Sequence, residues 1–152
     1  MFRKLFTTRA EFSPMIARIS LGLLLFPHGG QHFAGWFGGY GFRGTLGWMT
    51  GTLGFPASAA AVAIVVEFVA PFLLVAGLGS RAAALGLIGL MLGAISTHWP
   101  NGFFMNWFAA LPAGSEGYEY HLVVIALALT VVLNGSGKWS LDRQIEARLA
   151  AA

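Results

Sequence analysis

The sequence contains no cysteine and few charged residues. Cys is absent from its 152 residues, and only 10% of them are Asp, Glu, Lys or Arg. Without thiols the chain can form no disulfide, no thiolate zinc site and no iron–sulfur cluster, and thiol chemistry is excluded. A soluble domain carries about 25% charged residues. The deficit of charge, with 57% hydrophobic residues, therefore predicts a membrane protein.

Basic residues are unevenly placed along the chain. The N-terminus, the turn at 79–81 and the C-terminus hold most of the Lys and Arg, whereas the two aromatic-rich loops hold only Arg43. The positive-inside rule then places both termini in the cytoplasm and both loops outside. The formal net charge of +3 thus indicates topology, and it does not indicate nucleic-acid binding.

Long apolar stretches predict four membrane-spanning helices in a single domain, residues 1–152. A span needs about 20 mostly apolar residues, and segments rich in Gly, Pro and aromatics separate four such stretches. We place the spans at about residues 14–36, 56–78, 81–98 and 118–134. A short interfacial helix is expected over about residues 45–53. The expected fold is an all-α, multi-pass transmembrane four-helix bundle.

Ionisable residues within these apolar stretches mark the expected site, because they are costly in a bilayer and seldom face lipid. His28, Gln31 and His32 follow Pro27 at helical spacing, so they share a helix surface. Glu67 is the single charge of the second span and lies on a face of small residues, which should point inward. His28 and Glu67 lie at similar depths, roughly 14 to 17 Å below the outer surface at the helical rise. They are predicted to share a site.

Further polar residues lie at or near the span ends. His98 closes the third span, and Glu119 and His121 open the fourth, all at the outer side. Glu119 and His121 are two residues apart and should face different sides of their helix. Arg18 lies toward the cytoplasm, where snorkelling to the headgroups is an alternative role. The structural alternative for His28 and His32 is hydrogen bonding to backbone left free by the proline.

Small residues form a stripe along the third span, at Ala82, Gly86, Gly89 and Gly93. Such stripes let helix backbones approach each other closely. We therefore expect this face to pack tightly against another helix, so that Gly89→Leu would destabilise the protein.

Short motifs follow one another between residues 14 and 143. They are Arg18 with Gly22, His28-Gly29-x-Gln31, Glu67, Gly77-Leu78 with Arg81, His98 with Phe103, Glu119-Tyr120, and Gly135-x-Gly137 with Ser140-Leu141-Asp142. The ordered set resembles the DoxX family of small four-helix membrane proteins of the bacterial inner (cytoplasmic) membrane. His32 and His121 depart from that pattern, since relatives often carry Lys at the first position and Pro or an apolar residue at the second. Both departures add an imidazole.

The resemblance implies a link to membrane oxidoreductase complexes, because family namesakes resemble subunits of a terminal quinol oxidase and of thiosulfate:quinone oxidoreductase. The leading hypothesis is an oxidoreductase subunit that binds a quinone, with a partner redox protein or a second copy of the chain. Its expected catalytic residues are His28, Glu67 and Arg18, with the cofactor contacted by Gln31, His32, His98 and Glu119. Histidine and carboxylate groups suit a quinone because they form hydrogen bonds and exchange protons.

Two other functions remain open from the sequence. A metal-binding or solute-transport protein is one, because imidazoles and carboxylates near one membrane face could hold a transition metal. The candidate ligands are His28, His32, His98 and His121, and haem held by two of them is a variant without a supporting motif. A structural membrane anchor for a redox enzyme is the other.

Overall fold

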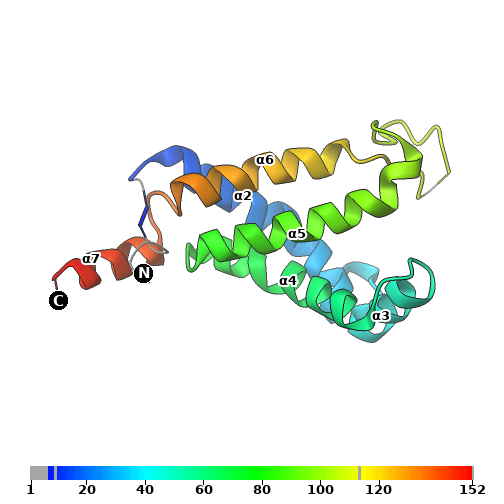
Figure 1. The fold of residues 1–152 in the computed structure, drawn as a ribbon, viewed down its shortest axis with the longest axis horizontal. Helices are drawn as coiled ribbons and strands as arrows, with labels where there is room; N and C mark the ends of the chain where they lie inside the picture. The colour runs from blue at the N-terminus through cyan, green and yellow to red at the C-terminus, as the bar shows by residue number, and fades with distance from the viewer. Residues whose placement is uncertain (1–6, 9, 113, 152) are drawn as a thin grey trace.

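The computed structural model describes residues 7–8, 10–112 and 114–151, which form an all-α fold (Figure 1). Within them lie six α-helices and no strand: α2 (Phe12–Gly29), α3 (Gly41–Gly51), α4 (Ala57–Ala76), α5 (Ser80–His98), α6 (Glu119–Asn134) and α7 (Leu141–Ala151). The π-helix η1 (Gly30–Ala34) and the 3-10 turn η2 (Trp36–Gly38) follow α2, and the 3-10 turn η3 (Trp99–Asn101) follows α5. The prediction of an all-α fold is confirmed. The helix predicted over 45–53 is α3, which begins earlier, at Gly41.

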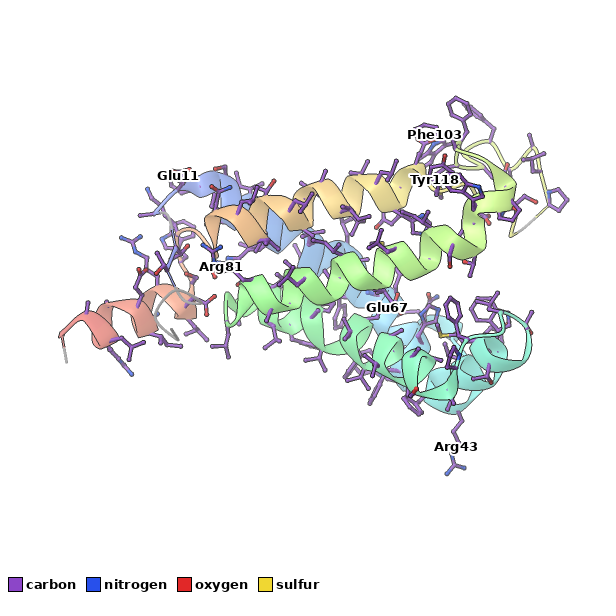
Figure 2. All side chains as sticks on the ribbon, viewed as in Figure 1. Glu11, Arg43, Glu67, Arg81, Phe103 and Tyr118 are labelled. Atoms are coloured by element: carbon purple, nitrogen blue, oxygen red, sulfur yellow. The ribbon has the colours of Figure 1, made fainter. Side chains whose placement is uncertain are left out.

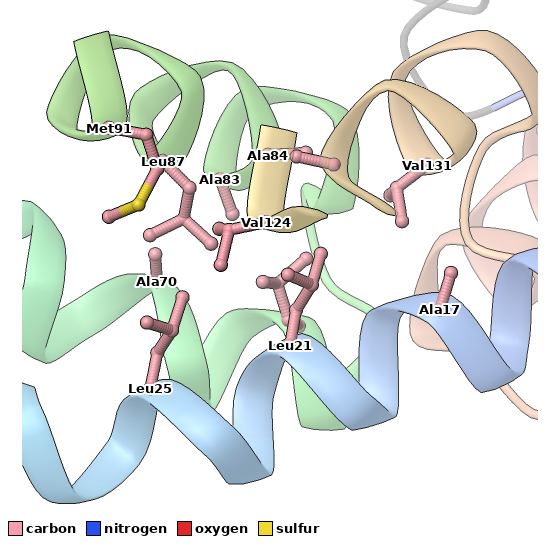
Figure 3. Packing of buried hydrophobic residues seen from close by; sticks show 12 residues of the cluster. Ala17, Leu21, Leu25, Ala70, Ala83, Ala84, Leu87, Met91, Val124 and Val131 are labelled. Atoms are coloured by element: carbon pink, nitrogen blue, oxygen red, sulfur yellow. The ribbon is translucent and has the colours of Figure 1, made fainter. Parts of the chain in front are cut away.

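The long helices α2, α4, α5 and α6 pack around one apolar core (Figure 3). Leu74, Leu87 and Val131 come from three different helices and are fully buried there. Large apolar side chains also cover the outside of each long helix: Leu23, Val62, Leu85 and Val123 are all exposed. Helices that are apolar all round belong inside a large protein or a membrane. Among the residues that the structure describes, two segments are long and apolar enough to cross a bilayer, Ala57–Ala76 and Ser80–Asn101.

Glycines on α2 let this helix lie close against α4. A Cβ built on Gly22 would lie 2.6 Å from Cγ2 of Val75, and one on Gly29 would lie 2.7 Å from the Cα of Phe68. No side chain fits at either point without a shift of the neighbouring helix. The contact at Gly29 holds the α4 backbone at Glu67 directly against the end of α2.

The small-residue stripe of α5 does not pack against another helix along its whole length, as the sequence had predicted. A Cβ on Gly86 would lie 3.0 Å from Cγ1 of Val66, but one on Gly89 or Gly93 would meet no atom within 4 Å. The prediction of close helix packing is therefore wrong at Gly89 and Gly93. Both residues border a cavity instead. A stripe of small residues predicts a shallow helix surface, and either a neighbouring helix or an open space can adjoin such a surface.

This difference between the two helices can be tested with alanine at single glycines. Gly29→Ala should lower the free energy of unfolding by about 1–3 kcal/mol, because the added methyl group meets rigid backbone. Gly89→Ala is the matched control and should leave stability unchanged or slightly raised, since alanine favours helix over glycine. The measurement is thermal unfolding of the detergent-solubilised protein. Equal melting temperatures for the two variants would contradict the close α2–α4 contact.

Candidate functional site

A cavity of about 700 Å³ lies between the helices at the end of the molecule far from the termini. In Figure 1 this is the end where α4 and α5 draw apart, with α3 beside α4. Its size falls within the range of about 300–1,000 Å³ that is usual for small-molecule sites. Its walls are largely apolar. The polar residues that line it are His28, His32, Thr45, Glu67, Thr97, His98, Glu116, Tyr120 and His121.

Glu67 and His32 form an ion pair on one side of this cavity. Nδ1 of His32 and Oε2 of Glu67 are 2.6 Å apart. Glu67 is 9% exposed, so its carboxyl group is largely removed from solvent, and a buried carboxylate requires a partner or a proton. The short distance is typical of a strong, charge-assisted hydrogen bond. The pair therefore shares one proton between an imidazole and a carboxylate.

The imidazole next to Glu67 belongs to His32, whereas the sequence placed His28 there. His32 lies in the π-helix that continues α2, in which the N–H of Gly35 bonds to the carbonyl of Gly30, five residues back. A π-helix has a wider turn than the α-helix that the sequence predicted here. His28 lines the same cavity from the preceding turn.

A second imidazole pair lies on another wall. The rings of His98 on α5 and His121 on α6 have centroids 4.9 Å apart, with their planes tilted by 36°. Nδ1 of His98 donates to the carbonyl oxygen of Glu116 at 2.8 Å. His121 is 9% exposed, yet its Nδ1 has no hydrogen-bond partner among the described residues. Both histidines line the cavity.

Glu119 and Gln31 do not line the cavity. Glu119 accepts hydrogen bonds from the backbone N–H of Met105 at 3.0 Å and from Nε1 of Trp107 at 3.2 Å, so it holds the loop before α6. Its spacing from His121 predicted that the two residues face different sides, and they do. Gln31 donates to the carbonyl of Phe37 at 3.4 Å and spans the turn after η1.

Arg18 is fully buried at the opposite end of the molecule, near the termini. Its guanidinium donates to the carbonyl oxygens of Leu74 and Val75 at 2.7 Å, in the last turn of α4. It also donates to three carbonyls of the segment between α6 and α7, those of Ser136, Lys138 and Trp139, at 2.7, 3.0 and 2.6 Å. Arg18 therefore joins three parts of the chain, and the alternative of snorkelling to headgroups does not hold.

Asp142 joins the same parts of the chain as Arg18. In the sequence it stood out only as part of a motif. The residue is 1% exposed, and its carboxylate accepts from the backbone N–H groups of Gly79 and Ser80 at 2.7 and 3.1 Å. Ser136 donates its hydroxyl to the same carboxylate. A carboxylate is favourable at the N-terminus of a helix such as α5. The Ser-Leu-Asp motif that begins α7 is the signal that could have predicted this cap.

Thr45 on α3 is a cavity residue that the sequence analysis missed. It is 1% exposed, and its hydroxyl has no hydrogen-bond partner among the described residues. A single threonine in a short aromatic-rich segment carries no pattern that predicts burial. Only the packing of α3 against α4 and η1 brings it to the cavity wall.

The histidines do not gather into a metal centre. Within residues 7–8, 10–112 and 114–151, no three His, Asp or Glu side chains are grouped as metal ligands would be. His32 pairs with Glu67, and His98 pairs with His121 on a different wall. The arrangement can bind polar atoms at two separate places and can exchange protons at both.

The apolar outer faces of the long helices, and the largely apolar cavity with a few polar groups between them, are typical of helical membrane proteins that bind small molecules. Residues 13–111 match the DoxX family model, which is more than half of the chain. The chain belongs to the DoxX family, and the resemblance inferred from the motifs is confirmed. Family membership implies a membrane protein. Comparisons with curated proteins and with solved structures gave no match.

Proposed function

We propose that the protein is a multi-pass subunit of the bacterial inner membrane, in which α2, α4, α5 and α6 form a transmembrane four-helix bundle. The distribution of basic residues supports cytoplasmic termini. Arg81 lies at the end that carries the termini, whereas exposed Arg43 projects from the other end (Figure 2). Arg143 and Arg148 belong to α7, which lies at the same end as Arg81 (Figure 1). By the positive-inside rule the first end is cytoplasmic. The cavity then lies in the outer half of the membrane.

The cavity is proposed to bind the head group of a quinone. This ligand is a flat apolar ring with carbonyl oxygens on opposite edges. The observation that carries the proposal is that one apolar cavity has two separate imidazole-containing pairs, His32–Glu67 and His98–His121, on different helices. In this proposal each pair hydrogen-bonds one carbonyl oxygen of the ring. His28 adds a third imidazole near the first pair.

The same groups suit the proton chemistry of a quinol. Oxidation of a quinol releases two electrons and two protons. The His32–Glu67 pair accepts one proton and the His98–His121 pair accepts the other, since imidazole and carboxylate are effective proton acceptors near neutral pH. The two electrons would pass to a redox cofactor of a partner protein, which would act as the oxidant. In this proposal Arg18, Gln31 and Glu119 position the helices and loops and do not touch the ligand.

Calorimetric titration of the purified protein with a short-chain quinone tests this function. Saturable binding is expected, and His121→Ala should weaken it about tenfold, because hydrogen bonds of this kind contribute roughly 1 kcal/mol or more. Quenching of tryptophan fluorescence would locate the ligand, since Trp48 lines the cavity. Trp48→Phe should remove much of the quenching, and Trp139→Phe, at an exposed residue near the termini, should remove little. Absence of saturable heat in the wild-type protein would refute the proposal.

A further inference from the structure

Some residues that line the cavity are also exposed on the outside of the molecule, so the cavity has openings. These exposed residues fall into two groups. His28 on α2 and Trp48 on α3 carry ring nitrogens. Ala59 and Val62 on α4 and Gly89 on α5 have no polar side chain. The second group marks a lateral opening between α4 and α5.

The contacts between α4 and α5 show where this lateral opening begins. A Cβ on Gly86 would lie 3.0 Å from Cγ1 of Val66, so the two helices touch at this point. About one turn further along α5, a Cβ on Gly89 would meet no atom within 4 Å. One turn before Val66 on α4, Val62 lines the cavity and is nevertheless 62% exposed. The helices therefore separate beyond the contact of Gly86 with Val66, as their ribbons do in Figure 1, and the cavity reaches the outside between them.

The surroundings of the lateral opening are those of the bilayer interior. Gly89 lies midway along α5 (Ser80–His98), which is long and apolar enough to span a membrane. When α5 spans a hydrocarbon core of about 30 Å, Gly89 lies near its centre. The residues on the two edges of the opening have no polar side chain: Ala59, Val62, Ala63 and Val66 on α4, and Gly86, Gly89, Leu90 and Gly93 on α5. Such edges accommodate a hydrocarbon chain but offer no partner to a polar group.

We infer that the ligand of the cavity carries a long hydrocarbon chain, and that this chain passes through the lateral opening into the bilayer. The inference rests on the proposed function, in which the polar ring lies in the cavity with the two imidazole pairs. A quinone with an isoprenoid chain would enter from the membrane, and its chain would stay in the hydrocarbon region. The chain would not pass His28 and Trp48, which border the other opening.

The test compares two ligands by calorimetric titration of the protein in lipid nanodiscs. One is a benzoquinone with a ten-carbon chain, and the other has a methyl group in place of the chain. Val62→Trp and Gly89→Leu place larger side chains in the lateral opening from opposite sides. Each should weaken binding of the long-chain ligand by about tenfold or more, because the added side chain and the hydrocarbon chain would compete for the same space. Binding of the methyl ligand should be unchanged. Each ligand is compared only with its own binding to the wild type, so its partition into lipid cancels.

Val65→Trp and Gly47→Leu are the matched controls. Val65 lies three residues after Val62 on α4 and is 42% exposed, but it does not line the cavity. Gly47 on α3 also does not line the cavity, and a Cβ there likewise meets no atom within 4 Å. Neither control should alter binding of either ligand. All four substitutions are at exposed residues, so the melting temperatures should stay close to that of the wild type.

The outcomes distinguish this inference from the proposed function. If the wild-type protein binds neither ligand, the proposed function fails and the inference fails with it. If the wild type binds both ligands and both variants at the lateral opening bind the long-chain ligand equally well, only the passage of the chain between α4 and α5 is refuted. Equal weakening of the methyl ligand, the same effect from the controls, or wild-type binding of the methyl ligand alone would also refute it.

Discussion

Replacement of Arg18 by methionine is expected to destabilise the protein more than any other single change considered for this chain. The loss should be about 3–5 kcal/mol, the usual effect of removing one partner from a buried charged network. Arg18 is fully buried, and its guanidinium donates to carbonyls of α4 and of the segment that leads into α7. Methionine fills much of the same space but donates no hydrogen bond, so the five carbonyls would all lose the guanidinium as a partner.

Two features of the surroundings of Arg18 explain why the expected loss of stability is large. The carbonyls of Leu74 and Val75 lie in the last turn of α4, where few helix donors remain. The carbonyl of Leu74 also accepts from the N–H of Gly77 at 3.2 Å. The buried carboxylate of Asp142, which bonds Ser136 next to Arg18, would also lose its neighbouring positive charge. Disruption at Arg18 would therefore loosen the end of α4, the start of α5 and the docking of α7 together.

Arg43→Met is the matched control for this prediction. Arg43 lies on α3 and is exposed, so the same substitution there should change stability by less than about 0.5 kcal/mol. Thermal and denaturant unfolding in detergent would measure both variants. A melting temperature of Arg18→Met close to that of the wild type would show that the hydrogen bonds of Arg18 contribute little to stability.

The second large effect is expected at Glu67 and His32. Glu67→Gln and His32→Ala should each weaken quinone binding at least about tenfold, and the double variant should bind little worse than either single variant. The two side chains share one proton across 2.6 Å, so removal of either partner disrupts the same group. Residues in direct contact typically show interaction energies of about 0.5–3 kcal/mol in a double-mutant cycle.

The control cycle combines Glu67→Gln with His121→Ala. His121 belongs to the other imidazole pair, and effects at separate sites usually add within about 0.3–0.5 kcal/mol. Additive losses for His32 and Glu67 would contradict a shared proton. His28 lines the same cavity, so the expectation from the sequence that His28 and Glu67 act together stays a prediction. The same titrations test it.

Composition and local patterns determined much of this protein without a structure. The deficit of charge and the apolar stretches predicted an all-α chain, and proline and glycine signals located α4, α5 and α6 within about two residues, as is usual for helix boundaries. The single charge in an apolar helix also predicted that Glu67 is buried. These features depend on residues that are close together in the chain, so they can be read from the sequence.

Only the tertiary structure decided which residues contact one another. A pattern predicts the face on which a residue lies but not what lies opposite it, so the α5 stripe borders a cavity at Gly89 where a helix was expected. The imidazole next to Glu67 is that of His32, which lies in a π-helix where the sequence had predicted a continuous α-helix. Arg18 bonds Ser136 across most of the chain, and Thr45 reaches the cavity only because α3 packs against α4. Such contacts join residues far apart in sequence, and only packing of the whole chain creates them.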